Sequence, residues 1–140
     1  MSQKWDHRYL ELAKLISTWS KDPNKQVGAV ITDANYVRGI GFNGLPRGVM
    51  DDEKILKDKN AKLPLIIHAE LNAIFAARGL GDTIYVWPCL PCTQCMGAII
   101  QQGGIKRVVT SVTTKHTRSS WNKDLVYNMA SETGILLYFI

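Results

Sequence analysis

The sequence is poor in cysteine and lacks a long apolar run, and each shortage excludes a class of protein. Three cysteines in 140 residues are too few, and odd in number, for the disulfide framework of a small secreted domain. No uncharged apolar stretch approaches the roughly 20 residues of a membrane-spanning helix. Residues 1–8 are too polar for a secretory signal. We therefore expect a cytoplasmic protein with reduced thiols and no membrane partner.

Long blocks of basic charge are also missing, although the chain as a whole is basic. Its formal net charge is +5, which favours anionic partners. The lysines and arginines are scattered, with no Arg-rich tail, so we expect a small anionic ligand rather than a nucleic acid. The composition, 46% hydrophobic and 21% charged, is that of a globular chain. We predict a single domain over residues 1–140.

Hydrophobic periodicity predicts alternating helices and strands. Apolar residues between Trp5 and Trp19 recur at helical spacing, which predicts an amphipathic helix. A β-branched run follows at residues 27–32 and a second predicted strand at residues 36–42, and the turn residues between them predict a hairpin. The charged segment 50–63 has no clean periodicity, so we expect a surface connection with room for a short helix.

The second half of the chain continues the alternation. It predicts, in order, a helix from residue 68 to 79 or 81, a strand at 83–87, a helix from 92 or 93 to about 102, a strand at 106–111, a helix at 121–132 and a strand at 135–140. Strands separated by helices imply parallel pairing, with helices on both faces of the sheet. The predicted fold is an α/β three-layer sandwich.

One imidazole, one carboxylate and two thiols have the spacing of a catalytic zinc site. His68 and Glu70 stand at the start of a predicted helix, and Cys92 and Cys95 share one face of another. Catalytic zinc takes three nitrogen or sulfur ligands and keeps one position open for water. We predict that His68, Cys92 and Cys95 bind zinc and that Glu70 stays uncoordinated as the proton carrier.

A third thiol, Cys89, leaves a structural alternative. It could join the three predicted ligands in a closed Cys3His site, as in a non-catalytic zinc module that binds nucleic acid. However, prolines at positions 88 and 91 favour an extended path past this residue. A closed site would also leave Glu70 without a role. Both points favour the catalytic interpretation.

Four stretches together resemble the zinc-dependent cytidine and deoxycytidylate deaminase family, and within it the deoxycytidylate (dCMP) deaminases. They are residues 20–31, the glycine-rich loop 41–48, the H-A-E segment 68–74 and P-C-T-Q-C at 91–95. The resemblance implies a five-stranded mixed sheet, one zinc ion per chain and hydrolysis of dCMP to dUMP and ammonia, which supplies thymidylate synthesis. It also implies a homohexamer that dCTP activates and dTTP, with Mg²⁺, inhibits.

The resemblance also implies roles for individual residues by motif position. Those implied as substrate contacts are Asn43 at the deoxyribose, Lys21 and Asn24 near the phosphate, and Ala69. Those implied as subunit-contact or regulatory positions are Phe75, Arg78 and Arg47. We expect Phe75 and Arg78 to lie on the same side of their helix.

Three stretches depart from the family pattern, one of them W-P-C at residues 87–89, which replaces the usual threonine-containing approach to the first cysteine ligand. Residues 113–118 do not match the usual sequence after the fourth strand, and segment 50–63 lacks ligands for a second structural zinc. The nearest alternative activity is that of a tRNA adenosine deaminase, which shares the zinc motif. The loop around Asn43 and residues 21–24 favour a nucleotide substrate instead.

Overall fold

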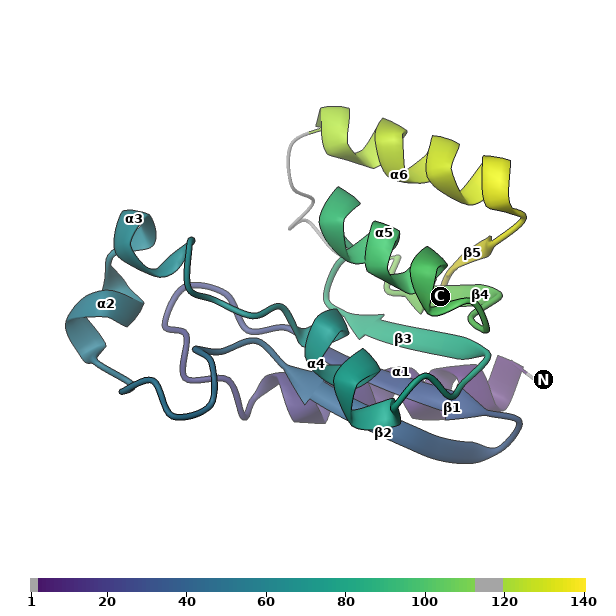
Figure 1. The fold of residues 1–140 in the computed structure, drawn as a ribbon. Coiled ribbons are helices and arrows are strands. Elements are labelled where there is room, and N and C mark those ends of the chain that lie inside the picture. The colour runs from purple at the N-terminus through teal and green to yellow at the C-terminus, as the bar shows by residue number, and fades with distance from the viewer. Residues whose placement is uncertain (1–2, 113–119) are drawn as a thin grey trace.

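A computed structural model describes residues 3–112 and 120–140, so the unusual stretch 113–118 lies outside the described residues. The helices and strands are, in chain order, α1 (Gln3–Ser17), β1 (Gly28–Asp33), β2 (Tyr36–Phe42), α2 (Glu53–Lys57), α3 (Lys59–Lys62), α4 (Ala69–Ala77), β3 (Thr83–Trp87), α5 (Thr93–Gln102), β4 (Arg107–Thr110), α6 (Ser120–Thr133) and β5 (Leu136–Phe139) (Figure 1). The predicted elements outside segment 50–63 are all present, with ends shifted by one or two residues in most cases. Among the described residues, no helix is long and apolar enough to cross a membrane.

The strands form one five-stranded mixed sheet in the order β2-β1-β3-β4-β5. β1 is antiparallel to both β2 and β3, whereas β3, β4 and β5 run parallel. The predicted hairpin is therefore confirmed, as is parallel pairing of the last three strands, which are joined through helices. The predicted α/β sandwich with a five-stranded mixed sheet is also confirmed.

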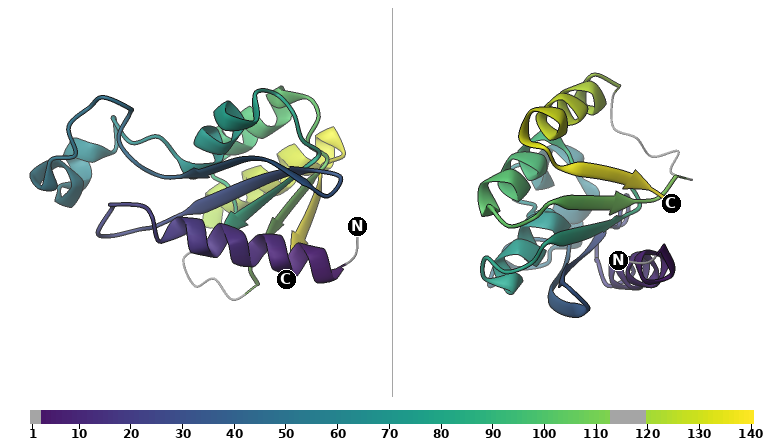
Figure 2. Two further views of the ribbon diagram at one scale, coloured as in Figure 1. Left: turned by 90° about the horizontal axis from the view of Figure 1, so that it is seen from below. Right: turned by 90° about the vertical axis from the view of Figure 1, so that its right-hand side faces the viewer.

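Helices cover both faces of the sheet. α1 lies on one face, and α4, α5 and α6 lie on the other (Figure 2). Neighbouring strand residues point to opposite faces, so Val30 packs beneath α1 while Ile31 faces the other three helices. Each face has its own buried apolar core.

The helix that begins beside His68 lies almost directly on the backbone of β2. A Cβ atom added at Gly41 would overlap the carbonyl oxygen of Ala69 and the amide nitrogen of Ala73, both in α4. The facing side of α4 is equally small, since Ala69, Ala73 and Ala77 are buried. This contact without intervening side chains fixes the position of α4, and with it the residues at its first turn.

The charged connection 50–63 contains two short helices, which project from the sheet as a lobe (Figure 1). The carboxylate of Asp52 accepts a hydrogen bond from the first turn of α2, and that of Asp58 caps α3 in the same way. The prediction of a surface connection describes most of these residues. The prediction misses Lys62, which is only 6% exposed. Hydrophobic periodicity could not show that the lobe folds back onto the segment after α1.

We predict that Gly41→Ala lowers the free energy of unfolding by about 1–3 kcal/mol, the usual cost of overpacking. The added methyl group would push α4 away from β2. The matched control is Gly97→Ala inside α5, where the new Cβ would meet only the Met129 Cε at 3.9 Å. That variant should be neutral or more stable by up to about 1 kcal/mol. Equal urea-unfolding curves for the two variants would contradict the close α4–β2 contact.

Candidate metal centre and cavity

Two helices begin at the same place, and the residue at each beginning carries a potential metal ligand. His68 is the N-cap of α4 and Cys92 is the N-cap of α5, both with extended backbone. An N-cap side chain commonly accepts a hydrogen bond from its own helix. Neither of these does so. Both side chains instead extend into the space between the helix starts, where Cys95 meets them from the first turn of α5.

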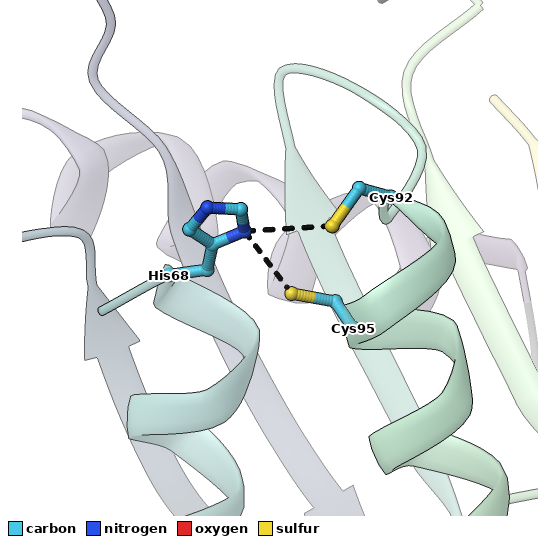
Figure 3. A group of neighbouring side chains, drawn as sticks. All are labelled: His68, Cys92 and Cys95. Carbon is cyan, nitrogen blue, oxygen red and sulfur yellow. Dashed lines mark hydrogen bonds between the residues drawn. The ribbon is translucent and has the colours of Figure 1, made fainter. Parts of the chain in front are cut away.

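The three potential ligand atoms lie at distances that suit zinc. His68 Nδ1 is 3.2 Å from Cys95 Sγ and 3.5 Å from Cys92 Sγ (Figure 3). All three atoms lie within 4.8 Å of one another. Tetrahedral zinc with normal bond lengths separates a nitrogen from a sulfur ligand by about 3.6 Å. The donor set and spacing therefore fit zinc, whereas Mg²⁺ prefers oxygen ligands and does not fit them.

The electrostatics of the cluster favour a thiolate at Cys92. A hydrogen bond from the Cys95 thiol lowers the pKa of Cys92 well below its usual range; burial opposes this shift, and His68 adds to it. Both helix N-termini also present their positive dipole ends to the cluster. Since the thiolate is the form that binds metal, the site is prepared for a cation at neutral pH.

Glu70 and Cys89 lie beside the cluster without belonging to it. Among the described residues, the group that could hold a metal consists of His68, Cys92 and Cys95. Glu70 is the second residue of α4, is 5% exposed and lines the neighbouring cavity. Cys89 is buried in the wall of the same cavity. The geometry therefore groups three ligands and leaves a carboxylate beside them, rather than a closed set of four.

The cavity has a volume of about 810 Å³, and residues of two chemically different kinds line it. That is within the usual range for small-molecule sites. His68, Glu70 and Cys92 line one part, beside the first turn of α4. The segment after α1 and the α2–α3 lobe line another, and they contribute the basic residues Lys25, Lys59 and Lys62.

The predicted substrate contacts are only partly brought together. Asn24, Asn43 and Ala69 line the cavity. Lys21 is not part of its lining: the side chain is exposed, and its ammonium lies 2.6 Å from Asp51 Oδ2. The structure therefore gives Lys21 a surface ion pair, and the cations of the cavity wall come from other lysines.

Asn43 holds the loop that borders the cavity. Its Oδ1 accepts a hydrogen bond from the Val27 amide at 2.9 Å, and its Nδ2 donates to the Lys25 carbonyl at 2.8 Å. Each end of an amide side chain can make one more hydrogen bond. Asn43 therefore shapes the cavity and still has capacity for a ligand. Its contact with a deoxyribose stays a prediction.

Sequence reasoning missed the three lysines that line the cavity among residues 3–112 and 120–140. Lys25 directly follows the predicted phosphate stretch and could have been included on that ground. Lys59 and Lys62 belong to the charged lobe, where many lysines alternate with acidic residues. No local pattern separates these two from their solvated neighbours, because only the path of the chain brings them to the cavity.

The predicted regulatory residues lie on the surface. Phe75 is 66% exposed, so it does not belong to the core of this chain. Arg47 is also exposed. Arg78 lies beyond the last helical residue, in the left-handed conformation with φ of 53°. The expectation that Arg78 shares a helix side with Phe75 is therefore wrong, because α4 ends at Ala77 and the chain turns there.

Zinc content should distinguish three ligands from four. We predict that Cys92→Ser loses most of its zinc, because a serine hydroxyl is a poor substitute for a thiolate. Cys89→Ser should keep about one zinc ion per chain, as measured by inductively coupled plasma mass spectrometry on purified protein. Loss of zinc from Cys89→Ser would instead support the closed structural site.

Comparison with known proteins agrees with this geometry. Residues 3–112 match the family described as the cytidine and deoxycytidylate deaminase zinc-binding region. An uncharacterised deaminase in the luxG 3′ region of Aliivibrio fischeri is 40% identical over 96% of this chain and 92% of its own length. Human deoxycytidylate deaminase is 37% identical over 93% of this chain and 78% of its own length. A cyanophage S-TIM5 dCMP deaminase, solved with dCMP and dUMP, has the same fold, with a TM-score of 0.78 at 21% identity over 100% of this chain and 99% of that one. The resemblance inferred from the motifs is thereby confirmed, and the chain belongs to the zinc-binding cytidine and deoxycytidylate deaminase family.

Proposed function

We propose that this protein hydrolyses dCMP to dUMP and ammonia, with one zinc ion held by His68, Cys92 and Cys95. The observation that carries the proposal is the cavity whose described lining combines Glu70 and two of the three cluster residues, His68 and Cys92, with three lysines. A nucleotide has the same division, with a base to be deaminated and a phosphate. Relatives from several animals, 37–43% identical to this chain, have the name deoxycytidylate deaminase or probable deoxycytidylate deaminase.

Glu70 is the residue that moves protons in this proposal. When bound, zinc makes a water molecule acidic enough to supply hydroxide near neutral pH. Glu70 accepts the proton that this water loses and delivers it to the pyrimidine ring nitrogen. The oxygen adds to the ring carbon that carries the amino group. Glu70 then takes the remaining proton of the added hydroxyl group and passes it to the amine, which leaves as ammonia while the hydroxyl becomes the carbonyl of dUMP. In support of this role, Glu70 is buried and lines the cavity together with His68 and Cys92.

The charges of the lining support a phosphate at the other part of the cavity. Lys25, Lys59 and Lys62 supply three positive charges there, and Asp22 offsets one of them. A phosphomonoester is dianionic, whereas deoxycytidine is neutral. The excess of positive charge therefore stabilises dCMP more than its nucleoside, and substrate choice depends on the phosphate.

The first test combines a carboxylate variant with a substrate panel. Glu70→Gln should lower kcat for dCMP by about a hundredfold or more, because it removes general acid–base catalysis, and it should keep its zinc. Glu132→Gln on the exposed side of α6 is the control and should match the wild type. Ammonia release is measured with dCMP, deoxycytidine, cytidine and an RNA hairpin.

The wild-type enzyme should have the highest kcat/KM with dCMP. Equal values for dCMP and deoxycytidine would contradict recognition of the phosphate. Ammonia release from the RNA hairpin alone would overturn the proposed substrate. Zinc loss from Glu70→Gln would make this carboxylate a metal ligand instead of a proton carrier.

We also propose that the protein works in the cytoplasm as a regulated homohexamer that supplies precursor for thymidylate. Exposed Phe75 on α4 supports a subunit contact, since interface cores favour aromatic residues. Because α4 also carries Glu70, a change at such a contact has a direct route to the site. In this proposal dCTP activates the enzyme and dTTP inhibits it, with Mg²⁺ bound to the triphosphate rather than to the zinc ligands.

Regulation should be visible in the kinetics and in the molar mass. We predict that dTTP raises the apparent KM for dCMP and that dCTP lowers it, in steady-state assays. Light scattering should give the mass of a hexamer, and Phe75→Asp should reduce that mass by placing a charge in the contact. A monomer with hyperbolic kinetics, indifferent to both triphosphates, would contradict the regulated assembly.

A further inference from the structure

A buried ion pair joins the α2–α3 lobe to the segment after α1. Lys62 Nζ lies 2.7 Å from Asp22 Oδ1, and the two side chains are 7% and 5% exposed. The two residues lie 40 positions apart in the chain, and both line the cavity. Since burying charge costs free energy unless it is well compensated, a lysine at this position calls for a functional explanation.

The Lys62 ammonium has hydrogen-bonding capacity left over. An ammonium group carries three N–H donors. Within the described residues, its hydrogen-bond acceptor is Asp22 Oδ1. An ammonium with spare donors, in the wall of a cavity, is suited to bind an anionic ligand there.

Lys62 differs from the other two lysines of the wall in its burial. Lys59 is exposed and Lys25 is half-buried, whereas Lys62 is buried. Water and salt screen an exposed charge strongly and a buried charge much less. At a similar distance, the Lys62 ammonium therefore attracts an anion in the cavity more strongly than either neighbour does, and Asp22 offsets part of this attraction.

Asp22 holds both the Lys62 ammonium and the backbone at Asn24 and Lys25. Its Oδ1 also accepts hydrogen bonds from the amides of Asn24 at 2.8 Å and Lys25 at 3.2 Å. Burial raises the pKa of Asp22, but the hydrogen bond from Lys62 and those from the two amides outweigh it and leave the pKa below its ordinary value. The carboxylate stays ionised at neutral pH and keeps the ammonium in one place.

We propose that Lys62 is the residue by which this cavity selects a nucleoside 5′-monophosphate over the nucleoside. Asp22 is its positioning residue, which holds the ammonium in the cavity wall. The inference rests on the proposed function, because it concerns the phosphate of the same substrate. It assigns phosphate selection to a residue of the lobe, outside the four motif stretches.

The test separates phosphate recognition from general damage to the site. Lys62→Met keeps the apolar length of the side chain and removes the charge. It should raise KM for dCMP about tenfold or more, the value of a hydrogen bond to a charged group. Its kcat for dCMP and its kcat/KM for deoxycytidine should stay within about threefold of wild type. Lys57→Met, an exposed lysine of the same lobe that does not line the cavity, is the control for loss of one positive charge.

Binding of the product provides a readout without turnover. Calorimetric titration of dUMP and of deoxyuridine should show weaker binding of dUMP alone in Lys62→Met, by about tenfold or more. Lys57→Met should bind dUMP like the wild type. If the wild-type protein binds dUMP but releases no ammonia from dCMP, the proposed function fails while the role of Lys62 is still tested here.

A double variant protects the test against misfolding. Lys62→Met alone leaves a buried unpaired carboxylate, which destabilises proteins strongly. Lys62→Met combined with Asp22→Asn removes both charges and keeps an oxygen at position 22 for the two amides. The double variant should fold and should show the same selective loss of dUMP binding as Lys62→Met.

Asp22→Asn tests the positioning role through non-additivity. It should change KM for dCMP in the wild-type background and have little effect once Lys62 is Met. Equal losses with dCMP and deoxycytidine in the folded double variant would show that the pair is only structural. Unchanged dUMP binding in that variant would overturn the inference, and additive effects of the two substitutions would overturn the role of Asp22.

Discussion

At Gly41 the backbone of β2 lies so close to α4 that a side chain would not fit between them. The geometry of the site depends on this close contact between helix and strand. Gly41 allows the helix backbone to approach the strand, and the alanines of α4 keep the other side small. A rigid contact of this kind leaves α4 little freedom to slide or tilt. The start of α4 is therefore held against the start of α5, and His68 meets Cys92 and Cys95 at ligand distances.

The start of a helix also explains how residues two positions apart can share one site. Within a regular helix, His68 and Glu70 would point in nearly opposite directions. His68 is an N-cap with extended backbone, so it lies outside the helical repeat, and Glu70 is in the first turn. Both line the cavity as a result. The same position exposes the cluster to the positive ends of two helix dipoles, which stabilise thiolates.

The charged residues of the cavity wall come from different parts of the chain. Glu70, His68 and Cys92 line the cavity beside the starts of α4 and α5, whereas Lys25, Lys59 and Lys62 come from the segment after α1 and from the α2–α3 lobe. The Lys62–Asp22 ion pair joins the α2–α3 lobe to the segment after α1. The lobe is also close to the ligand cluster along the chain, because His68 follows Lys62 by only six residues. That short segment is itself fixed, since Ile67 and Gly44 exchange two backbone hydrogen bonds of 2.7 and 3.1 Å. The lobe and the residues beside the ligand cluster are thus parts of the wall of one cavity.

The sequence by itself determined the features that depend on local spacing. Hydrophobic periodicity predicted nearly every helix and strand, because a buried face repeats at the period of its own element. The H-A-E and P-C-T-Q-C stretches predicted the ligand cluster, because the residue types and the short spacings within each stretch are those of zinc ligands. Tertiary structure decided what depends on the path of the chain. It brought Lys62 to Asp22 across 40 residues, paired Lys21 with Asp51 at the surface, and ended α4 before Arg78. Charged residues of a lobe have no periodicity that distinguishes a cavity wall from solvent, so only the folded chain could make that distinction.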